Sequence, residues 1–529
     1  MFCGSSNPND MTLVEPVETA VKCIEDGDTV GIGGFVAVGI PEYVLEALGD
    51  RYAKSGAPGD LTLFHPAAEG DRQGSGISHL VQDGMLKRVI GSHWGFVPDL
   101  IEKIVAGDVE AYNLPFGAMD HLLRDTAAGK PGTITTVGLR TFVDPRQEGA
   151  KANDVTTEDI VEVVTLDDEE YLFYHSQSLD VAIIRATTAD ENGNLTMERE
   201  ALTSNMLATA QAAHNSGGTV IAQVERVTKT GSLSAREIDV PGVVVDTVVE
   251  APDSHHMQTY GEEYSGAYSG EIRVPRDDDA SGTTLTERKI IARRAAMELV
   301  SDAVVNLGVG VPEIIPVVAN EGNISDEIIQ TVEAGPIGGS PSGGISFGTA
   351  LNHEALVTSP EQFDFYDGGG LDIGYLGMAQ VDADGNINVS HFGSQLPGCG
   401  GFINITQNAE KVVFCGTLTN GGMEVNAGDG TLEIVSEGDD TKFIDEVEQI
   451  TFSGDYAVGT DQPIVYVTER AVFELSDAGL VLTEVAPGVD VDTEVVDQMA
   501  FDPVVADDVS EMNPMLFREE STDLTEYVG

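Results

Sequence analysis

The sequence predicts an α/β protein built from two related open, mostly parallel-sheet domains. Short β-branched and apolar runs alternate with helical stretches, as in the strand-like 29–35, the helix-like 41–54 and the strand-like 60–65. Parallel strands need a crossover connection, so repeated strand–helix alternation is typical of parallel sheets. The 529 residues suffice for two large domains or three of average size.

The chain also resembles itself. LDVAIIRATTADENGNL at 179–195 aligns with LDIGYLGMAQVDADGNI at 371–387, and AHNSGGTVIAQV at 213–224 aligns with TQNAEKVVFCGT at 406–417. Self-similarity at a nearly constant spacing indicates an internal duplication. We therefore expect both halves to have the same sheet architecture.

The domain bounds follow from a change in composition. Residues 251–285 are polar and glycine-rich, with little apolar periodicity, and indicate a connection. We predict an N-terminal domain over 1–250, a linker over 251–285 and a C-terminal domain over 286–529.

Charge excludes several classes of partner. The chain has 27 basic and 89 acidic residues, a formal net charge of −62. A phosphate-binding surface needs clustered Lys and Arg, so neither nucleic acid nor an anionic membrane is expected as a partner. The acids are spread through well-patterned segments, which indicates a folded acidic surface adapted to molar salt, where the Debye length is about 3 Å. We expect a halophilic source.

Other features favour a cytoplasmic location. No apolar run is long enough to span a membrane, and the first thirty residues lack the pattern of a secretory signal. The four cysteines (Cys3, Cys23, Cys399 and Cys415) form neither a disulfide framework nor a CxxC metal pair.

Two glycine-rich loops are candidates for ligand binding. GIGGFVAVGIPE at 31–42 and NLGVGVPE at 306–313 each follow a predicted strand and lead into a helix. Neither is a P-loop, and a proline stands where a dinucleotide fingerprint would have its third glycine. Each loop is either an ordinary tight turn or a place where the backbone approaches a ligand.

Glu333 is the one charged residue in TVEAGPIGGSPSGG at 331–344. It follows the run EIIQTV, which places it at or just past the C-terminal end of a strand, the edge where open α/β sheets bind ligands. Taken alone it is either a solvated turn glutamate or a nucleophile. Cys399, between glycines, is either a reactive thiol or a small packed residue.

Longer motifs resemble a known family. DGDTVGIGGFVAVGIPE, VEAGPIGG, FYDGGGLDIGYLGMAQVDADGNINVSHFG and GCGGFINITQNAEKVVFCGT resemble the family I CoA-transferases, in particular the single-chain acetate/propionate branch. The resemblance covers residues 13–520.

The resemblance implies a fold, a reaction and roles for residues. Glu333 matches the catalytic glutamate, which would carry CoA as a glutamyl thioester between a short-chain acyl-CoA and a carboxylate by ping-pong kinetics. The amides of Gly400 and Gly401 are the candidate oxyanion donors. The loop Gly308, Val309, Gly310, Val311 and Pro312 would line the CoA arm. The resemblance implies a homo-oligomer in short-chain fatty acid metabolism, with no metal and no cofactor beyond CoA as co-substrate.

One position departs from the family. The family usually has glutamine in a Pro-Gln-Gly triplet, whereas this chain has Phe116 between Pro115 and Gly117. Phenylalanine cannot donate a hydrogen bond, and losing one such donor typically lowers the rate about 10²–10³-fold. Two alternatives therefore remain beside CoA transfer: hydrolysis of acyl-CoA, and a CoA-binding regulatory protein that has lost its activity.

Overall fold

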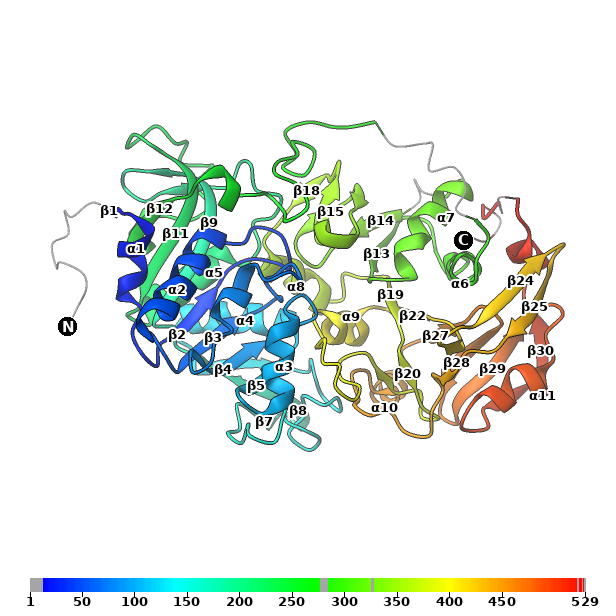
Figure 1. Ribbon diagram of the computed structural model, residues 1–529. Coiled ribbons are helices and arrows are strands. Elements are labelled where there is room, and N and C mark those ends of the chain that lie inside the picture. Colours follow the sequence, from blue (N-terminus) through cyan, green and yellow to red (C-terminus); the bar gives the residue numbers. More distant parts are fainter. Residues whose placement is uncertain (1–12, 276–283, 325–327, 521–522, 526, 528–529) are drawn as a thin grey trace.

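The computed structural model describes residues 13–275, 284–324, 328–520, 523–525 and 527. Cys3 and residues 276–283, near the end of the predicted linker, lie outside these residues. Within them the chain forms two lobes, each built around one large sheet (Figure 1).

The sheet of the N-terminal lobe is parallel throughout its main path. Its strand order is β1 (Leu13–Val14), β12 (Thr247–Glu250), β11 (Thr219–Thr228), β9 (Val181–Asp190), β2 (Thr29–Ile32), β3 (Leu61–His65), β4 (Leu86–Gly91) and β5 (Glu110–Asn113), with the short β10 (Leu195–Thr196) antiparallel to β9. A small antiparallel sheet of β6 (Gly132–Thr135), β8 (Glu169–His175) and β7 (Val161–Leu166) is attached to this lobe.

The sheet of the C-terminal lobe is parallel at its centre and antiparallel near both edges. Its order is β18 (Ala355–Leu356), β15 (Pro336–Ile337), β14 (Ile328–Thr331), β13 (Ala303–Leu307), β19 (Ile373–Gly377), β22 (Lys411–Cys415), β27 (Ile464–Val467), β28 (Ala471–Ser476), β29 (Gly479–Val485) and β30 (Val504–Glu511). β30 runs parallel to β29. Short hairpin strands complete the lobe: β16 (Ser340–Pro341), β17 (Ala350–Leu351), β20 (Gln380–Val381), β21 (Ile387–Asn388), β23 (Thr419–Asn420), β24 (Glu424–Gly428), β25 (Thr431–Ser436) and β26 (Asp440–Thr441).

The two sheets share one topology, as the self-similarity predicted. The order β12-β11-β9-β2-β3 in the first lobe is matched by β27-β22-β19-β13-β14 in the second. The glycine loops follow β2 and β13, which hold equivalent places, and Glu333 follows β14, the equivalent of β3. The expectation of two related, mostly parallel α/β sheets is confirmed.

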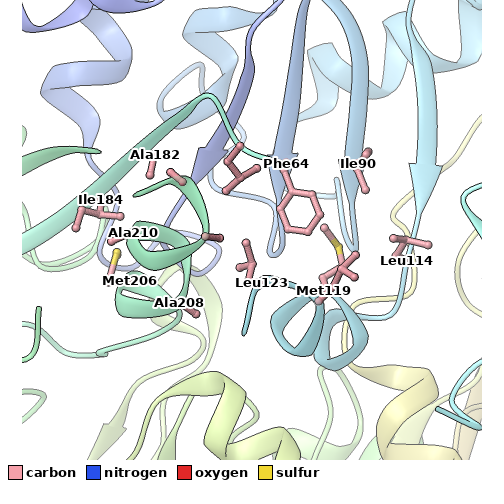
Figure 2. Close-up of a cluster of buried hydrophobic side chains, with 14 of the residues drawn as sticks. Phe64, Ile90, Leu114, Met119, Leu123, Ala182, Ile184, Met206, Ala208 and Ala210 are labelled. Carbon is pink, nitrogen blue, oxygen red and sulfur yellow. The ribbon is translucent and has the colours of Figure 1, made fainter. Parts of the chain in front are cut away.

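Helices cover both faces of each sheet. In the first lobe α2 (Glu42–Ser55) and α3 (Pro98–Ala106) pack on one face, while α4 (Phe116–Ala127) and α5 (Met206–Asn215) pack on the other. Figure 2 shows this second layer, where Phe64 and Ile90 from the strands meet Met119 and Leu123 from α4. Successive strand residues point to opposite faces, which explains the continuous apolar runs of these buried parallel strands.

The second lobe follows the same plan. α6 (Glu287–Ala296) and α7 (Ile315–Glu321) cover one face of its sheet, while α8 (Ser359–Asp367), α9 (Phe402–Asn408) and α10 (Gly454–Gly459) lie on the other. The remaining short helices are α1 (Val17–Ala20) and α11 (Val491–Glu494).

The lobes meet through three helices. α4 of the first lobe packs against α8 and α9 of the second, and Figure 1 shows these helices in the middle of the molecule. The Gly117 amide donates to Asn404 Oδ1 at 3.1 Å, and the Gly138 amide donates to Gln407 Oε1 at 2.7 Å. The start of α4 is therefore held directly on α9.

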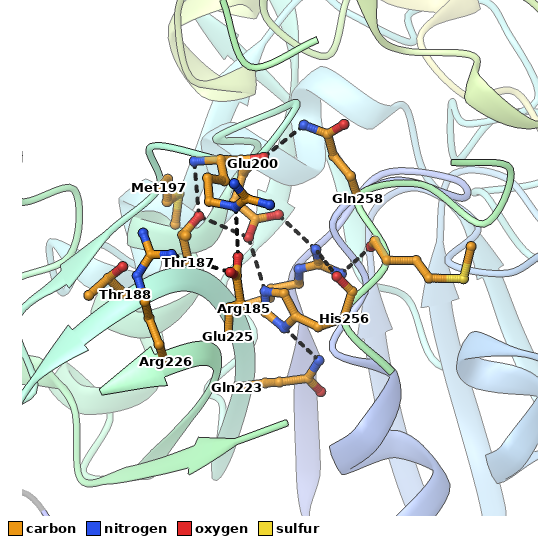
Figure 3. A network of polar contacts seen from close by, with 12 residues as sticks. Arg185, Thr187, Thr188, Met197, Glu200, Gln223, Glu225, Arg226, His256 and Gln258 are labelled. Atoms are coloured by element: carbon orange, nitrogen blue, oxygen red, sulfur yellow. Dashed lines mark hydrogen bonds and ion pairs between the residues drawn. The ribbon is translucent and has the colours of Figure 1, made fainter. Parts of the chain in front are cut away.

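The predicted linker is more ordered than its composition suggested. Its first part packs on the N-terminal lobe, where the Arg185 guanidinium donates to the carbonyl of Met257 at 2.6 Å and pairs with Glu200 at 3.1 Å (Figure 3). His256 contacts the same carboxylate at 3.3 Å. Burial opposes ionisation of Glu200, but Arg185 and His256 outweigh it and lower the pKa of Glu200 to about 2. Further along, the Val274 amide donates to Asn352 Oδ1 at 2.9 Å, so the segment contacts both lobes.

Candidate active site

A cavity of about 580 Å³ lies between the lobes. The first lobe contributes the glycine loop after β2, the turns after β3 and β4, and the start of α4. The second lobe contributes Asn306 on β13, the turn after β14 and the glycine-rich segment before α9. The carboxyl ends of parallel strands from both sheets therefore meet at one site, as expected for open α/β sheets.

Glu333 lies where the sequence placed it, two residues past the end of β14. The chain turns sharply here, since the Gly335 amide donates to the Val332 carbonyl at 3.0 Å. Gly335 has a φ of 130°, and a Cβ there would come within 2.1 Å of the Val357 carbonyl oxygen, so only glycine fits. The turn directs the half-buried Glu333 side chain into the cavity.

The surroundings of Glu333 are apolar with one polar support. Burial raises the pKa of Glu333, and hydrogen bonding from its own backbone and from the Asn306 amide partly opposes this rise. Asn306 Nδ2 also donates to the Tyr366 hydroxyl at 3.3 Å, which donates to Thr331 Oγ1 at 2.7 Å. Removing a carboxylate from water makes it more basic and more reactive as a nucleophile. Nothing in the sequence assigned a role to Asn306, although it is the first residue of the NLGVGVPE loop.

The segment Gly398–Gly401 forms the opposite wall of the cavity. Both backbone groups of Gly400 bind the first lobe: its amide donates to the Ser92 carbonyl at 2.8 Å, and its carbonyl accepts from the Phe116 amide at 2.9 Å. The Gly401 amide has no acceptor within the described part of the chain. A Cβ on Gly401 would lie 3.6 Å from Glu333 Cγ, so Gly401 lies next to the Glu333 side chain. Of the two predicted oxyanion donors, Gly400 has its amide occupied and Gly401 does not.

Only the first two residues of the predicted CoA loop line the cavity. Gly308 and Val309 line the cavity, and the Gly308 amide is held by the Tyr375 carbonyl at 2.8 Å. Gly310 has a φ of 98°, and its amide donates to Glu313 Oε2 at 3.1 Å. Gly310, Val311 and Pro312 are not among the residues that line the cavity.

Cys399 is a packed residue. Its side chain is buried and lies in the core cluster of the first lobe. Burial raises the pKa of the Cys399 thiol, so little thiolate forms at neutral pH. The reading of Cys399 as a reactive thiol is therefore disfavoured.

Phe116 opens α4 and belongs to a row of aromatic rings. Its ring meets Phe363 edge-on with 5.0 Å between centroids, and Phe35 lies 5.5 Å away on another side. Phe347 continues the row at 5.9 Å from Phe35. Phe35, Phe116 and Phe347 line the cavity, and we call these three residues the aromatic wall.

Val36, next to the wall, has a strained backbone. Its φ of 52° is rare for a β-branched residue and costs of order 1–3 kcal/mol. Four backbone hydrogen bonds impose it: the Val36 amide to Ala67, the Gly70 amide to Val36, and a reciprocal pair between Phe35 and Val38. Such strain persists where a site needs a particular shape, and here it fixes the position of Phe35.

The first lobe also supplies polar groups to the cavity. Arg72 lies over the Phe96 ring at 4.4 Å, and its Nε donates to the Gly95 carbonyl at 2.9 Å. Burial and the nearby Arg72 charge lower the pKa of His93 to about 4, so His93 is neutral at physiological pH. Among the described residues that line the cavity, Arg72 carries the positive charge. This charge suits an anionic substrate.

Two features are absent from the part of the chain that the structure describes. None of the described helices is both long and apolar enough to cross a membrane. The described residues contain no cluster of three or more His, Cys, Asp or Glu side chains arranged to hold a metal ion.

The fold and the site together define a two-lobed α/β protein with a desolvated glutamate facing a glycine-rich wall. The sequence profile of the coenzyme A transferase family matches residues 14–251. The chain is 45% identical over 516 residues to a caffeate CoA-transferase of Acetobacterium woodii, covering 96% of this chain and 98% of that protein. It is 42% identical over 515 residues to the acetate CoA-transferase YdiF of Escherichia coli K12, covering 96% of each.

Solved structures of related proteins have the same fold over nearly the whole chain. The acyl-CoA transferase YdiF apoenzyme of Escherichia coli O157:H7 superposes with a TM-score of 0.93 at 40% identity, covering 97% of this chain and 98% of that one. A thioester complex of YdiF with CoA gives 0.91 at 39% identity, covering 97% of each. The chain belongs to the coenzyme A transferase family, and it is an enzyme that transfers CoA.

Proposed function

We propose that this enzyme transfers CoA between a short-chain acyl-CoA, such as acetyl- or propionyl-CoA, and a free carboxylate through a thioester on Glu333. The observation that carries the proposal is the Glu333 carboxylate itself, desolvated in the cavity between the lobes, with Gly401 next to its side chain. A YdiF structure is described as a thioester complex with CoA, which supports an enzyme-bound thioester here.

The chemistry balances without an added proton or electron. The Glu333 carboxylate attacks the acyl-CoA carbonyl, expels CoA thiolate and forms a mixed anhydride. The thiolate attacks the glutamyl carbonyl, releases the first acid and leaves the glutamyl-CoA thioester. An incoming carboxylate attacks that thioester, and the thiolate then takes the new acyl group and restores Glu333. The glutamyl-CoA thioester has about the same energy as the acyl-CoA thioester, so the transfer runs in both directions.

We assign roles to the other residues by their backbone groups. The Gly401 amide stabilises the oxyanion that forms beside Glu333. Gly400 joins this segment to the first lobe through its hydrogen bonds with Ser92 and Phe116. Gly308 and Val309 contact the CoA arm, and the rest of that loop, Gly310–Pro312, shapes the turn. The two lobes correspond to domains over 1–250 and 286–529, joined by 251–285.

A matched pair of glycine variants, each of which keeps its backbone amide, tests which of the two glycines adjoins the reacting centre. Gly401 has φ −81° and ψ −1°, which alanine adopts freely, but its Cβ would press on Phe363 Cζ at 3.3 Å and approach Glu333. We expect Gly401→Ala to lower kcat about 10–100-fold with little change in melting temperature. Gly400 has a φ of 53° and open space around its Cβ, so Gly400→Ala should lose about 1 kcal/mol of stability and keep most activity. The reverse pattern, with activity lost only in Gly400→Ala, would contradict the assignment.

Hydrolysis is the second candidate function. Phe116 stands where the family usually has glutamine, and a reshaped acyl site that admits water would release acid and CoA. A CoA-binding protein without activity is the third reading. The acceptor carboxylate separates these readings, because only a transferase needs it for turnover.

Trapping of the thioester tests the proposed function. The enzyme is incubated in high salt with acetyl-CoA alone, and the peptide that contains Glu333 is examined by mass spectrometry. We expect the mass of CoA on that peptide, its loss after borohydride reduction, and acetyl transfer only when a carboxylate is added. Thiol release without acceptor would indicate a hydrolase, and no adduct with no turnover would indicate a binder.

We also propose a halophilic, cytoplasmic homo-oligomer that serves short-chain fatty acid metabolism. The net charge of −62 supports adaptation to high salt. The lack of a disulfide among the described cysteines is compatible with a reducing compartment. Family resemblance supports the oligomer and the pathway.

A further inference from the structure

Phe363 connects the aromatic wall to the nucleophile, because it packs against Phe116 and lies beside Gly401. A Cβ on Gly401 would lie 3.6 Å from Glu333 Cγ and 3.3 Å from Phe363 Cζ, so carboxylate, glycine and ring are immediate neighbours. Phe363 packs edge-on against Phe116, and Phe35 and Phe347 extend the row along the cavity. A group attached to a carbonyl at Glu333 therefore has an apolar surface close by.

The wall offers no hydrogen bond to an acyl group. Phe116 is 1% exposed and its backbone amide is already bound to Gly400, so nothing polar remains at this position. Val36 and Ile345 line the cavity as further apolar side chains. A polar acyl group placed against these surfaces would lose its hydration without replacement, which disfavours its binding.

The backbone holds the aromatic wall in place. The strained φ of Val36 fixes Phe35, so the wall is a built feature of the fold.

We propose that the acyl site prefers acyl groups with an aromatic or similarly bulky apolar body over acetyl, and that Phe116, with Phe35 and Phe347, determines this preference. The inference rests on the proposed function because it concerns the acyl group of the same reaction. Stacking and edge-on contacts between rings add to the burial of apolar area, so a phenyl group gains most from this wall.

Binding to an inactive enzyme tests the preference apart from catalysis. Glu333→Gln protein in concentrated KCl is titrated by calorimetry with acetyl-CoA, 3-phenylpropanoyl-CoA and succinyl-CoA. We expect 3-phenylpropanoyl-CoA to bind at least about tenfold more tightly than acetyl-CoA, because a single methylene in an apolar pocket is worth about 10–200-fold. Succinyl-CoA should bind less tightly than 3-phenylpropanoyl-CoA, because the wall offers its carboxylate no hydrogen bond. Equal or weaker binding of 3-phenylpropanoyl-CoA would overturn the proposal.

Three further variants in the Glu333→Gln background locate the preference. Phe116→Gln should reduce the ratio of 3-phenylpropanoyl-CoA to acetyl-CoA affinity at least about fivefold, and Phe347→Gln, at a half-buried position, should reduce it in the same direction. Phe173→Gln on β8, outside the cavity, is the matched control and should leave the ratio unchanged. If Phe116→Gln does not fold, the affinity ratio of Phe347→Gln alone tests the assignment. An unchanged ratio in the folded wall variants would overturn the assignment.

This design separates the two proposals. If wild-type enzyme traps no CoA on Glu333 but the affinity ratio favours 3-phenylpropanoyl-CoA, the proposed function fails and the binding preference stands. If the thioester forms with acetyl-CoA but the affinity ratio is one or less, the reaction stands and the preference fails.

Discussion

Glu333→Gln is expected to abolish CoA transfer while leaving the fold intact. The amide cannot form the anhydride, so the loss should reach at least about 10⁴-fold, as for removal of other covalent nucleophiles. The assay is acetyl transfer from acetyl-CoA to propionate in purified protein. Transfer at the wild-type rate in the variant would refute the role of Glu333.

The same variant should be at least as stable as the wild type at pH 7. Burial raises the pKa of Glu333, so the folded state holds its proton more tightly than the unfolded state does. Ionisation therefore costs stability as pH rises from the ordinary carboxyl pKa through the raised one, and this cost is absent at lower pH. Glutamine removes the ionisation. We expect the melting temperature of Glu333→Gln to equal or exceed that of wild type at pH 7, with the difference vanishing towards pH 4.

The second large effect is expected from salt. With a net charge of −62 the folded protein repels itself, and the Debye length shrinks from about 10 Å at 0.1 M to about 3 Å at 1 M salt. We expect the melting temperature to rise by at least about 10 °C between dilute buffer and concentrated KCl, since a few kcal/mol correspond to such a shift. Differential scanning fluorimetry over a KCl series measures it, and a flat series would exclude halophilic adaptation.

Exposed acids on an edge strand provide the control. Asp507 and Asp508 are exposed neighbours on β30, and both add to the net negative charge. The double variant Asp507→Asn and Asp508→Asn should be relatively more stable in dilute buffer and less dependent on KCl. Ser510→Asn on the same strand changes no charge and should follow the wild-type series.

Local sequence patterns predicted the fold well. The alternation of apolar runs and helices indicated parallel sheets, and the repeat at 179–195 and 371–387 indicated two copies of one topology. These signals are reliable because periodicity and turn chemistry are local properties of the chain. The antiparallel pairings of β28 with β27 and with β29 were not anticipated, since strand direction depends on which neighbour each strand finds in the folded sheet.

The site was only partly predictable. The place of Glu333 past a strand end followed from the flanking residues, and its role followed from the family resemblance. No local pattern indicated that the Gly400 amide would bind Ser92, or that Asn306 would support Glu333, because each contact joins residues far apart in the chain. The positive φ of Val36 was equally hidden, since valine is among the residues least expected there.

The amino-acid order was therefore sufficient for the sheet class, the duplication, the acidic surface and the position of Glu333 at a strand end. The folded arrangement alone determined which glycine amide stays unpaired, how far the nucleophile is desolvated, and that Phe363 and the aromatic wall form one row of rings. The reason is physical: periodicity and charge are summed along the chain, whereas burial, a raised pKa and ring contacts arise only when the two lobes enclose a cavity.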